Sequence, residues 1–389
     1  MRSGLCSGTW PLAWCAGCKV NLSALRPSQV VYPCFGLRDS VASKIGLCKI
    51  LRDIDPALCY VLPEDHGRVA KQMDGTQLWV SKRDTDPAVL TSRNSNGGVW
   101  VPEGKQEKWY NTNQFHGGNA VQFFTTPDQL PSLSHDAAVA VVVQPFFQPF
   151  LGKGCMARKW ELRVAVAVVS IDPPRFYYYS KWEVNIARKL FDAAAHRADE
   201  CVHDTHMIGV KGSCYEPCLV DIKGYPKDGH FNQANGTNGG GRMMAFSAYA
   251  AVAPMPSAAV AVLERRIHKL LAKVFYHRTT LEGLSSNPIT TGIEASGASC
   301  FHWLRVDMGV SEALKPVIFE VNTNPETSTE LGKAGPRYTS HRDLFRMLEL
   351  DKPTRLPRAE RKTWEQDNAG GWRPITPPPS VQIREIHST

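Results

Sequence analysis

Hydrophobic residues recur along this chain with two different spacings. Steps of three and four across 39–52 and again across 257–275 each predict an amphipathic helix, with Asp39 or Ser40 as the cap of the first. A continuous apolar run at 137–147 predicts a buried strand. Apolar runs at 301–308 and 317–322, joined by a polar connection, predict an antiparallel strand pair. The pattern indicates an α/β (α+β) chain.

Acidic side chains interrupt this last strand pair. Asp307 lies on the first strand, and Glu320 and Asn322 share a face of the second, with Phe319 and Val321 on the other face. Two carboxylates and an amide oxygen converging between apolar strands repel one another unless a hard cation lies among them. Magnesium suits that oxygen set. The alternative is a solvated hairpin edge that carries incidental acids.

A second charged row precedes a proline turn. Lys159, Glu161 and Arg163 alternate with apolar residues, so their side chains point the same way along a predicted strand. Residues 172–174 (Asp-Pro-Pro) then turn the chain into an aromatic strand. The row is either a solvated surface with weak ion pairing or the lining of a site for phosphates and a carboxylate.

Two further stretches have the chemistry of a nucleotide site. The apolar run LWVSKRD delivers Lys82 to a loop that contains Gly97 and Gly98. Such a glycine pair lets backbone N–H groups approach a phosphate, and it is equally the composition of a hairpin turn. The run 137–147 ends in Phe146 and Phe147, which suit either the wall of a flat aromatic ligand or a plain core strand.

Composition narrows the possible partners. The chain has 389 residues, 43% hydrophobic and 21% charged, with a net charge of +8 and 11 cysteines. The charge favours an acidic partner. No apolar stretch is long enough for a bilayer span and no nucleic-acid-binding motif is present, so we expect neither a membrane nor a nucleic-acid partner. The N-terminal segment makes a poor signal peptide, so we expect a cytoplasmic protein whose cysteines are reduced.

Other segments carry weaker signals. His203, Thr205 and His206 precede a predicted strand. Three cysteines nearby make a zinc site an alternative, although their spacing matches no standard zinc finger. Residues 228–242 are polar and glycine-rich, which indicates a loop, and the chain beyond about 350 is rich in proline and charge, which predicts a disordered tail.

Several of these stretches follow one another in a recognisable order. Along the chain they are ALRPSQVVYPCFGLRDSVASKIGLCKILRD, LWVSKR, VVVQPFF, ARKWELRVAVAVVSIDPPRFYYY, HDTHMIGVK and FHWLRVDMGVSEALKPVIFEVNTNP. Together they resemble the tubulin-tyrosine-ligase-like family of ATP-grasp ligases, with its L-R-P-x-Q, W-I-x-K-P, V-V-Q-K-Y-I, R-K-F-D-L-R, H-x-T-N and E-V-N-x-x-P motifs. The resemblance covers roughly residues 20–335.

The resemblance implies a fold and a domain order. We expect an ATP-grasp-like fold with mixed and antiparallel sheets flanked by helices and the nucleotide in a cleft between lobes. The expected units are an N-terminal lobe truncated relative to that of the family, a central lobe, a C-terminal lobe with the metal site and the disordered tail, at 1–70, 71–170, 171–340 and 350–389.

The resemblance also implies roles for individual residues. Magnesium would be held by Asp307, Glu320 and Asn322. ATP would be bound by Lys82, Gln144, Pro145, Phe146, Phe147, Lys159 and Glu161. The substrate would be lined by Arg163, Asn185, His203, Thr205 and His206, with Arg163 and Glu320 as the catalytic pair.

The chain departs from the family motifs at several of these positions. Pro145 stands where the hinge has Lys, Glu161 where the strand has Asp, and His206 where the segment has Asn. Asn185 stands where the family has an Arg that grips a substrate carboxylate, unless Arg188 takes that role. The glycine-rich loop also lacks the basic residue that the family usually carries there.

The expected function is an ATP-dependent protein–amino acid ligase that forms an amide through an acyl phosphate. Tubulin tails are the expected acceptor, glutamate the favoured amino acid, and the cytoplasm, with the cytoskeleton or a cilium, the expected location. The alternatives are a catalytically degenerate relative that binds nucleotide or tubulin, and an ATP-grasp ligase of a small acid or peptide. The sequence does not distinguish glutamylation, glycylation and tyrosination.

Overall fold

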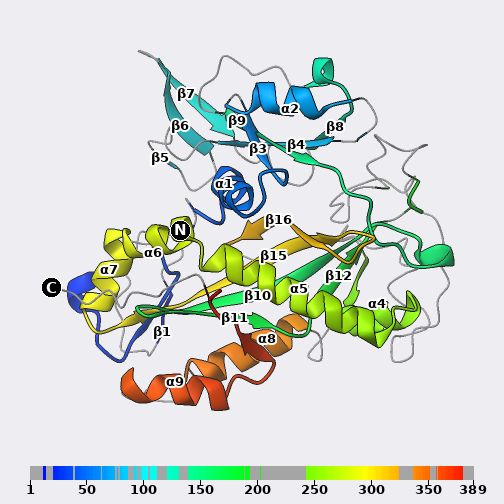
Figure 1. Cartoon of the computed structure of the whole chain (residues 1–389). Coiled ribbons are helices and arrows are strands. Elements are labelled where there is room, and N and C mark those ends of the chain that lie inside the picture. Colours follow the sequence, from blue (N-terminus) through cyan, green and yellow to red (C-terminus); the bar gives the residue numbers. More distant parts are fainter. Residues whose placement is uncertain are drawn as a thin grey trace.

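A computed structural model gives the fold of the chain, shown in Figure 1. It describes residues 12–14, 21–37, 40–62, 64–74, 77, 79–85, 92–93, 98–103, 106–111, 121–130, 139–187, 189–192, 202, 242–323, 336–350, 356 and 358–379. In this part of the chain helices and antiparallel sheets are mixed, so the predicted α/β class is confirmed at that level.

The central sheet contains seven of the described strands. They are β10 (Trp160–Ile171), β11 (Pro174–Tyr179), β12 (Glu183–Ile186), β13 (Arg242–Ala245), β15 (His302–Val310), β16 (Pro316–Asn322) and β17 (Trp372–Pro374). The order is β13-β12-β10-β11-β17, and β15 pairs with both β10 and β16. Because β10 and β11 form one hairpin, the expected boundary at residue 170 runs through a single sheet.

The described residues form three smaller sheets besides this one. An antiparallel sheet of order β3-β9-β4-β8 consists of β3 (Tyr60–Leu62), β9 (Val139–Pro145), β4 (Trp79–Thr85) and β8 (Val121–Phe124). A hairpin sheet consists of β5 (Ser92–Arg93), β6 (Gly98–Glu103) and β7 (Gln106–Asn111). The third is parallel and joins β1 (Leu12–Trp14), β2 (Val30–Tyr32) and β14 (Ser299–Cys300).

Eight α-helices are described around the sheets. They are α1 (Lys44–Ile54), α2 (His66–Gln72), α4 (Phe246–Val252), α5 (Ser257–Phe275), α6 (Arg278–Ser285), α7 (Pro288–Ala295), α8 (Pro336–Met347) and α9 (Arg358–Asp367). In Figure 1, α5 runs across the central sheet, α8 and α9 lie below it, and α1 lies between it and the four-stranded sheet above. None of the described helices meets the length and hydropathy that a bilayer crossing requires.

The two predicted helices form, with one corrected boundary. The range 257–275 is α5, whose Leu263, Ile267 and Leu271 are fully buried. The range 39–52 becomes 44–54, because the hydroxyl of Ser43, and not that of Ser40, accepts from Gly46 N at 2.8 Å and caps α1. Asp39, the other predicted cap, lies outside the described residues.

Alternation along β10 divides the core into two parts. Leu162, Val164 and Val166 face a large apolar cluster that includes the buried side of α5. Farther along the strand, Ala167 and Val169 face a second cluster that includes α8 and β17. The beginning of that second face, at 159–163, is charged, and this is where the candidate site lies.

The chain beyond residue 350 corrects an expectation. Instead of a disordered tail over 350–389, the structure has α9 and β17 within residues 358–379. Arg175 of β11 donates to both carboxylate oxygens of Glu365 at 2.8 and 2.9 Å, and Trp372 is fully buried. This segment belongs to the fold because it extends the central sheet and covers its second apolar cluster.

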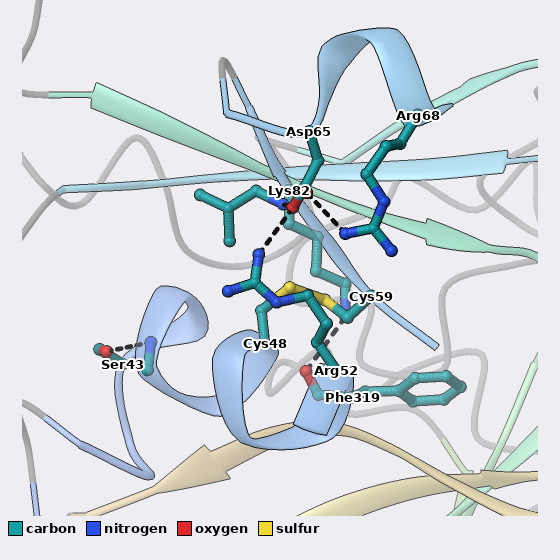
Figure 2. Close-up of a disulfide and its surroundings, with 10 residues drawn as sticks. Ser43, Cys48, Arg52, Cys59, Asp65, Arg68, Lys82 and Phe319 are labelled. Carbon is teal, nitrogen blue, oxygen red and sulfur yellow. Dashed lines mark hydrogen bonds and ion pairs between the residues drawn. A yellow bond between two sulfur atoms is a disulfide. The ribbon is translucent and has the colours of Figure 1, made fainter. Parts of the chain in front are cut away.

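Among the described residues, two disulfides replace the expected reduced thiols. Cys34 is bonded to Cys300, which joins the segment after β2 to β14. Cys48 is bonded to Cys59 and ties α1 to the start of β3, as Figure 2 shows. Among the described residues no cysteine is free.

Candidate functional site

One face of the central sheet gathers charged side chains from adjacent strands. The strand register sets Arg163 of β10 beside Asp307 of β15 on one side and Glu183 of β12 on the other. Asp307 in turn lies beside Glu320 of β16. The sequence predicts that Asp307 and Glu320 face each other across an antiparallel pair, and the register confirms this.

A β-bulge in β16 changes which side chains share that face. The register slips between Asp307 and Met308, and Ile318 and Val321 are both buried in the large apolar cluster. The two residues between them, Phe319 and Glu320, therefore both face the charged side. Strict alternation had assigned Phe319 to the opposite face, which was wrong because the extra residue of a bulge breaks the period of two.

Phe319 is one of several stacked rings beside the site. Its ring centroid lies 5.6 Å from that of Phe147, which lies 6.1 Å from Phe146, which in turn lies 6.2 Å from Phe191. Gly309 of β15 lies under this stack, where a Cβ atom would come within 2.2 Å of Phe147 Cζ. The run that the sequence assigns to adenine therefore joins the charged face through aromatic contacts.

Asp307 is the most enclosed acid of the face, at 2% exposure. Its Oδ2 accepts from Asn322 Nδ2 at 3.0 Å. Its Oδ1 lies 3.5 Å from Arg163 Nε and 3.4 Å from Arg305 Nε. One carboxylate thus meets one amide and two guanidinium groups.

Asn185 directly contacts Arg163. With its amide oxygen turned toward the guanidinium, Asn185 accepts from Arg163 Nε at 2.6 Å and from Nη2 at 3.0 Å. Asn185 is buried, as is Glu183 two residues earlier on β12. The residue that departs from the family motif therefore lies in the site and orients Arg163. Arg188, the proposed replacement, lies outside the described residues.

Two lysines approach the site from different sheets. Lys159 Nζ lies 3.3 Å from Glu161 Oε1 and 5.5 Å from the centre of the Phe319 ring. Lys82 lies within β4, not in the loop that the sequence predicts, and its Nζ donates to Phe319 O at 3.4 Å and lies 5.0 Å from the ring centre. Figure 2 shows its side chain extending from β4 toward Phe319.

The charges around Lys82 partly offset the cost of its burial. Burial lowers the pKa of Lys82, while the negative charges of Glu320 and Glu161 raise it. Lys82 links the four-stranded sheet to the central sheet through its contact with Phe319 of β16. A phosphate placed here would find two ammonium groups against one aromatic ring.

The predicted hinge residues follow in β9. Gln144 is buried and pairs with Val80 of β4, and Pro145 ends the strand next to Trp79. Phe146 O accepts from Gln77 Nε2 at 3.5 Å. The backbone at the end of β9 is thus the part of the four-stranded sheet that leads into the aromatic stack.

Magnesium, which the resemblance implies, fits the donor set. Asp307 and Glu320 are register partners and Asn322 already touches Asp307, so three oxygen-bearing side chains are adjacent. Asn322 presents its N–H to Asp307, and a half-turn of its amide would present the oxygen instead. No group of three or more His, Cys, Asp or Glu that could hold a metal exists among the described residues, so a metal bound here would need the amide oxygen of Asn322 as well.

Several predicted residues lie outside the described part of the chain. These are His203, Thr205 and His206 of the substrate lining, and Gly97 of the glycine pair. The cysteines at 201, 214 and 218, which made a zinc site an alternative, also lie outside the described residues. Gly98 begins β6 and pairs with Asn111.

The structure adds three residues that the sequence reasoning missed. Arg305 and Glu183 have the same strand parity as Asp307 and Asn185, and that parity was a signal available in the sequence. Phe319 had no such signal, because only the bulge brings it to this face.

Comparison with protein-family models finds no match for this chain, and comparison with curated proteins finds none either. The family resemblance therefore rests on the motifs in the sequence.

Proposed function

We propose that this chain is an ATP- and magnesium-dependent ligase of ATP-grasp type that joins an amino acid to a protein carboxylate. The observation that carries the proposal is the adjacency of Asp307, Glu320 and Asn322 on one sheet face. Cationic groups flank that face, with Lys159 and Arg163 on the same sheet and Lys82 arriving from another. Oxygen ligands beside cations are the requirement for handling a nucleoside triphosphate.

Each group has a distinct task in such a reaction. Asp307, Glu320 and Asn322 would hold the ion, which when bound neutralises phosphate charge. The ammonium groups of Lys82 and Lys159 would bind the phosphoryl oxygens. Arg163, oriented by Asn185, would stabilise the acceptor carboxylate and the negative charge that develops as the amine attacks the acyl phosphate.

No nucleophilic side chain is required for this chemistry. The acceptor carboxylate attacks the γ-phosphorus of ATP and releases ADP, and the amino group of the incoming amino acid then displaces phosphate to form the amide. The protein contributes positioning and charge stabilisation. The face supports this because it combines groups from strands of two different sheets.

An acidic protein is the acceptor that the charge favours. The net charge of +8 attracts acidic chains, and tubulin tails are the acidic acceptor that the family resemblance implies. We propose tubulin as the acceptor and glutamate as the added amino acid, which would make the reaction a glutamylation in the cytoplasm or at a microtubule-based structure.

The proposal is tested by incorporation of labelled glutamate, glycine and tyrosine into microtubules with ATP and magnesium. The expected result is ATP-dependent labelling by one of them, lost in Glu320→Gln. If a verified ligase labels the same microtubules while this chain labels none with any of the three, the ligase proposal fails.

A second candidate has its own supporting observation. Arg163 is already engaged by both Asn185 and Asp307, so it has less capacity to grip a substrate carboxylate. This favours a catalytically silent protein that binds nucleotide or tubulin. Nucleotide binding or co-sedimentation with microtubules, together with absent incorporation, would distinguish it, whereas ATP-dependent activity on free acids without tubulin would indicate a small-molecule ligase.

A further inference from the structure

Arg305 has a position that the proposed reaction does not use. It lies on β15 two residues before Asp307, and the strand register sets it beside Asn322 of β16. Its Nε is 3.4 Å from Asp307 Oδ1, and its side chain is 16% exposed against 3% for that of Asp307. Arg305 therefore borders two of the three groups that are proposed to hold the metal.

The second guanidinium on Asp307 is Arg163, which has a different environment. Arg163 is fixed by Asn185 through two short contacts and has a proposed role toward the substrate. Among the described residues, Asp307 is the acid with which Arg305 forms an ion pair. The charge of Arg305 is therefore directed at Asp307.

A fixed positive charge beside a ligand carboxylate weakens its attraction for a divalent cation. The guanidinium and the divalent cation repel each other, and the carboxylate oxygen that faces the guanidinium is less available as a metal ligand. The same positive charge attracts phosphate oxygens. A site built in this way disfavours the free ion and favours an ion that arrives with an anionic nucleotide.

We infer that Arg305 sets the order of metal binding at this site: it keeps Asp307 charge-compensated without nucleotide, so that the divalent ion binds as its complex with a nucleoside triphosphate. This inference rests on the proposed function for the identity of the site. Arg305 is accordingly a positioning residue that acts through Asp307, and its charge, not its shape, is the property that matters.

The test is binding of Mn²⁺ alone, measured by electron paramagnetic resonance on the full chain, in three proteins. The wild type is expected to bind weakly and Arg305→Gln about tenfold more tightly or better, a change of about 1.4 kcal/mol. Arg305→Lys retains the charge and is expected to stay within about threefold of the wild type. Equal or weaker binding in Arg305→Gln than in the wild type would overturn the inference.

Two controls make the result specific. Adding Glu320→Gln to Arg305→Gln must remove the gained affinity, since otherwise the manganese is bound elsewhere and the inference fails. If Arg305→Gln does not fold, Arg305→Met takes its place. A second measurement needs no variant: the Mn²⁺ affinity of the wild type is compared with and without a non-hydrolysable ATP analogue. If the analogue does not tighten Mn²⁺ binding, the inference is contradicted. Tighter manganese binding in Arg305→Gln, together with no amino acid incorporation by the wild type, would leave the inference standing and reject the ligase.

Discussion

At the scale of single residues, Gly309 shows how closely the site is packed. A Cβ atom here would come within 2.2 Å of Phe147 Cζ and 2.5 Å of Phe319 Cζ, far inside normal contact. Glycine fits here because the edges of two aromatic rings occupy the place of a Cβ atom. The aromatic stack and the acidic side chains of the face thus depend on the same stretch of β15.

We expect Gly309→Ala to destabilise the protein by about 1–3 kcal/mol, the usual cost of overpacking, and to displace Phe319 from Lys82. Chemical denaturation measures the first effect. Gly67→Ala is the matched control, because a Cβ there meets nothing within 4 Å and the helix α2 should gain up to about 1 kcal/mol. Equal effects of the two substitutions would contradict this account of the packing.

His302 lies between two backbone acceptors at the other end of β15. Its Nδ1 is 2.8 Å from Cys34 O and its Nε2 is 2.9 Å from Thr323 O, which also accepts from Tyr32 Oη at 3.2 Å. A neutral imidazole carries one N–H, so it can donate to only one of these carbonyls. Burial lowers the pKa of His302, while both carbonyl contacts raise it by a smaller amount.

The pH dependence of stability follows from this shift. The folded pKa lies below the ordinary value of 6.5, so above that pH neither state is protonated and the contribution of His302 to stability is complete. As the pH falls below 6.5 the unfolded chain binds the proton first, and stability declines by up to about 1.4 kcal/mol per pH unit.

Free energies of unfolding at pH 7.5 and 5.5 test this prediction, with His302→Gln as the comparison. The variant should be less stable at pH 7.5 and should lose less stability on acidification than the wild type. An unchanged loss in the variant would assign the pH dependence to other groups.

At the scale of elements, regular periodicity was predictable and local irregularity was not. α5 has an unbroken apolar stripe, and its predicted and observed ranges coincide. β16 contains a bulge, which no pattern of apolar residues reports, so Phe319 was assigned to the wrong face. β17 is three residues long and ends at Pro374, and its composition resembles that of a tail. Trp372 of β17 is buried because β17 pairs with β11, and the sequence pattern does not report that pairing.

The β17 element gives a prediction of its own. Trp372 is fully buried, its ring centroid lies 5.2 Å from that of Tyr179 in a tilted arrangement, and its Nε1 donates to Ser340 O at 3.1 Å. Trp372→Ala should therefore cost about 3–5 kcal/mol. Arg373→Ala, on the exposed side of the same strand, should change stability by about 0.5 kcal/mol or less. Comparable small losses in both variants would mean that this segment is not part of the core.

At the scale of the whole molecule, the site depends on contacts between parts that are distant in sequence. Lys82 reaches Phe319 across 237 positions, and the Cys34–Cys300 disulfide joins residues 266 apart. The spacing of residues along the sequence cannot predict such long-range contacts. It could identify Asp307, Glu320 and Asn322, because they interrupt one apolar strand pair, but the bulge that pairs Asp307 with Glu320 was not predictable. It gave Lys159, Glu161 and Arg163 as a row, but not the packing that encloses them.

The central claim is that these three oxygen-bearing side chains hold a divalent ion beneath a nucleotide. Isothermal titration of the protein with a non-hydrolysable ATP analogue, with magnesium and with EDTA, tests it most directly when the wild type is compared with Glu320→Gln. We predict that the wild type binds the analogue at least about tenfold more tightly with magnesium, and that Glu320→Gln loses this gain while its unfolding free energy stays within about 0.5 kcal/mol of the wild type. Equal affinity with and without magnesium in the wild type, or an unchanged gain in Glu320→Gln, would contradict the claim.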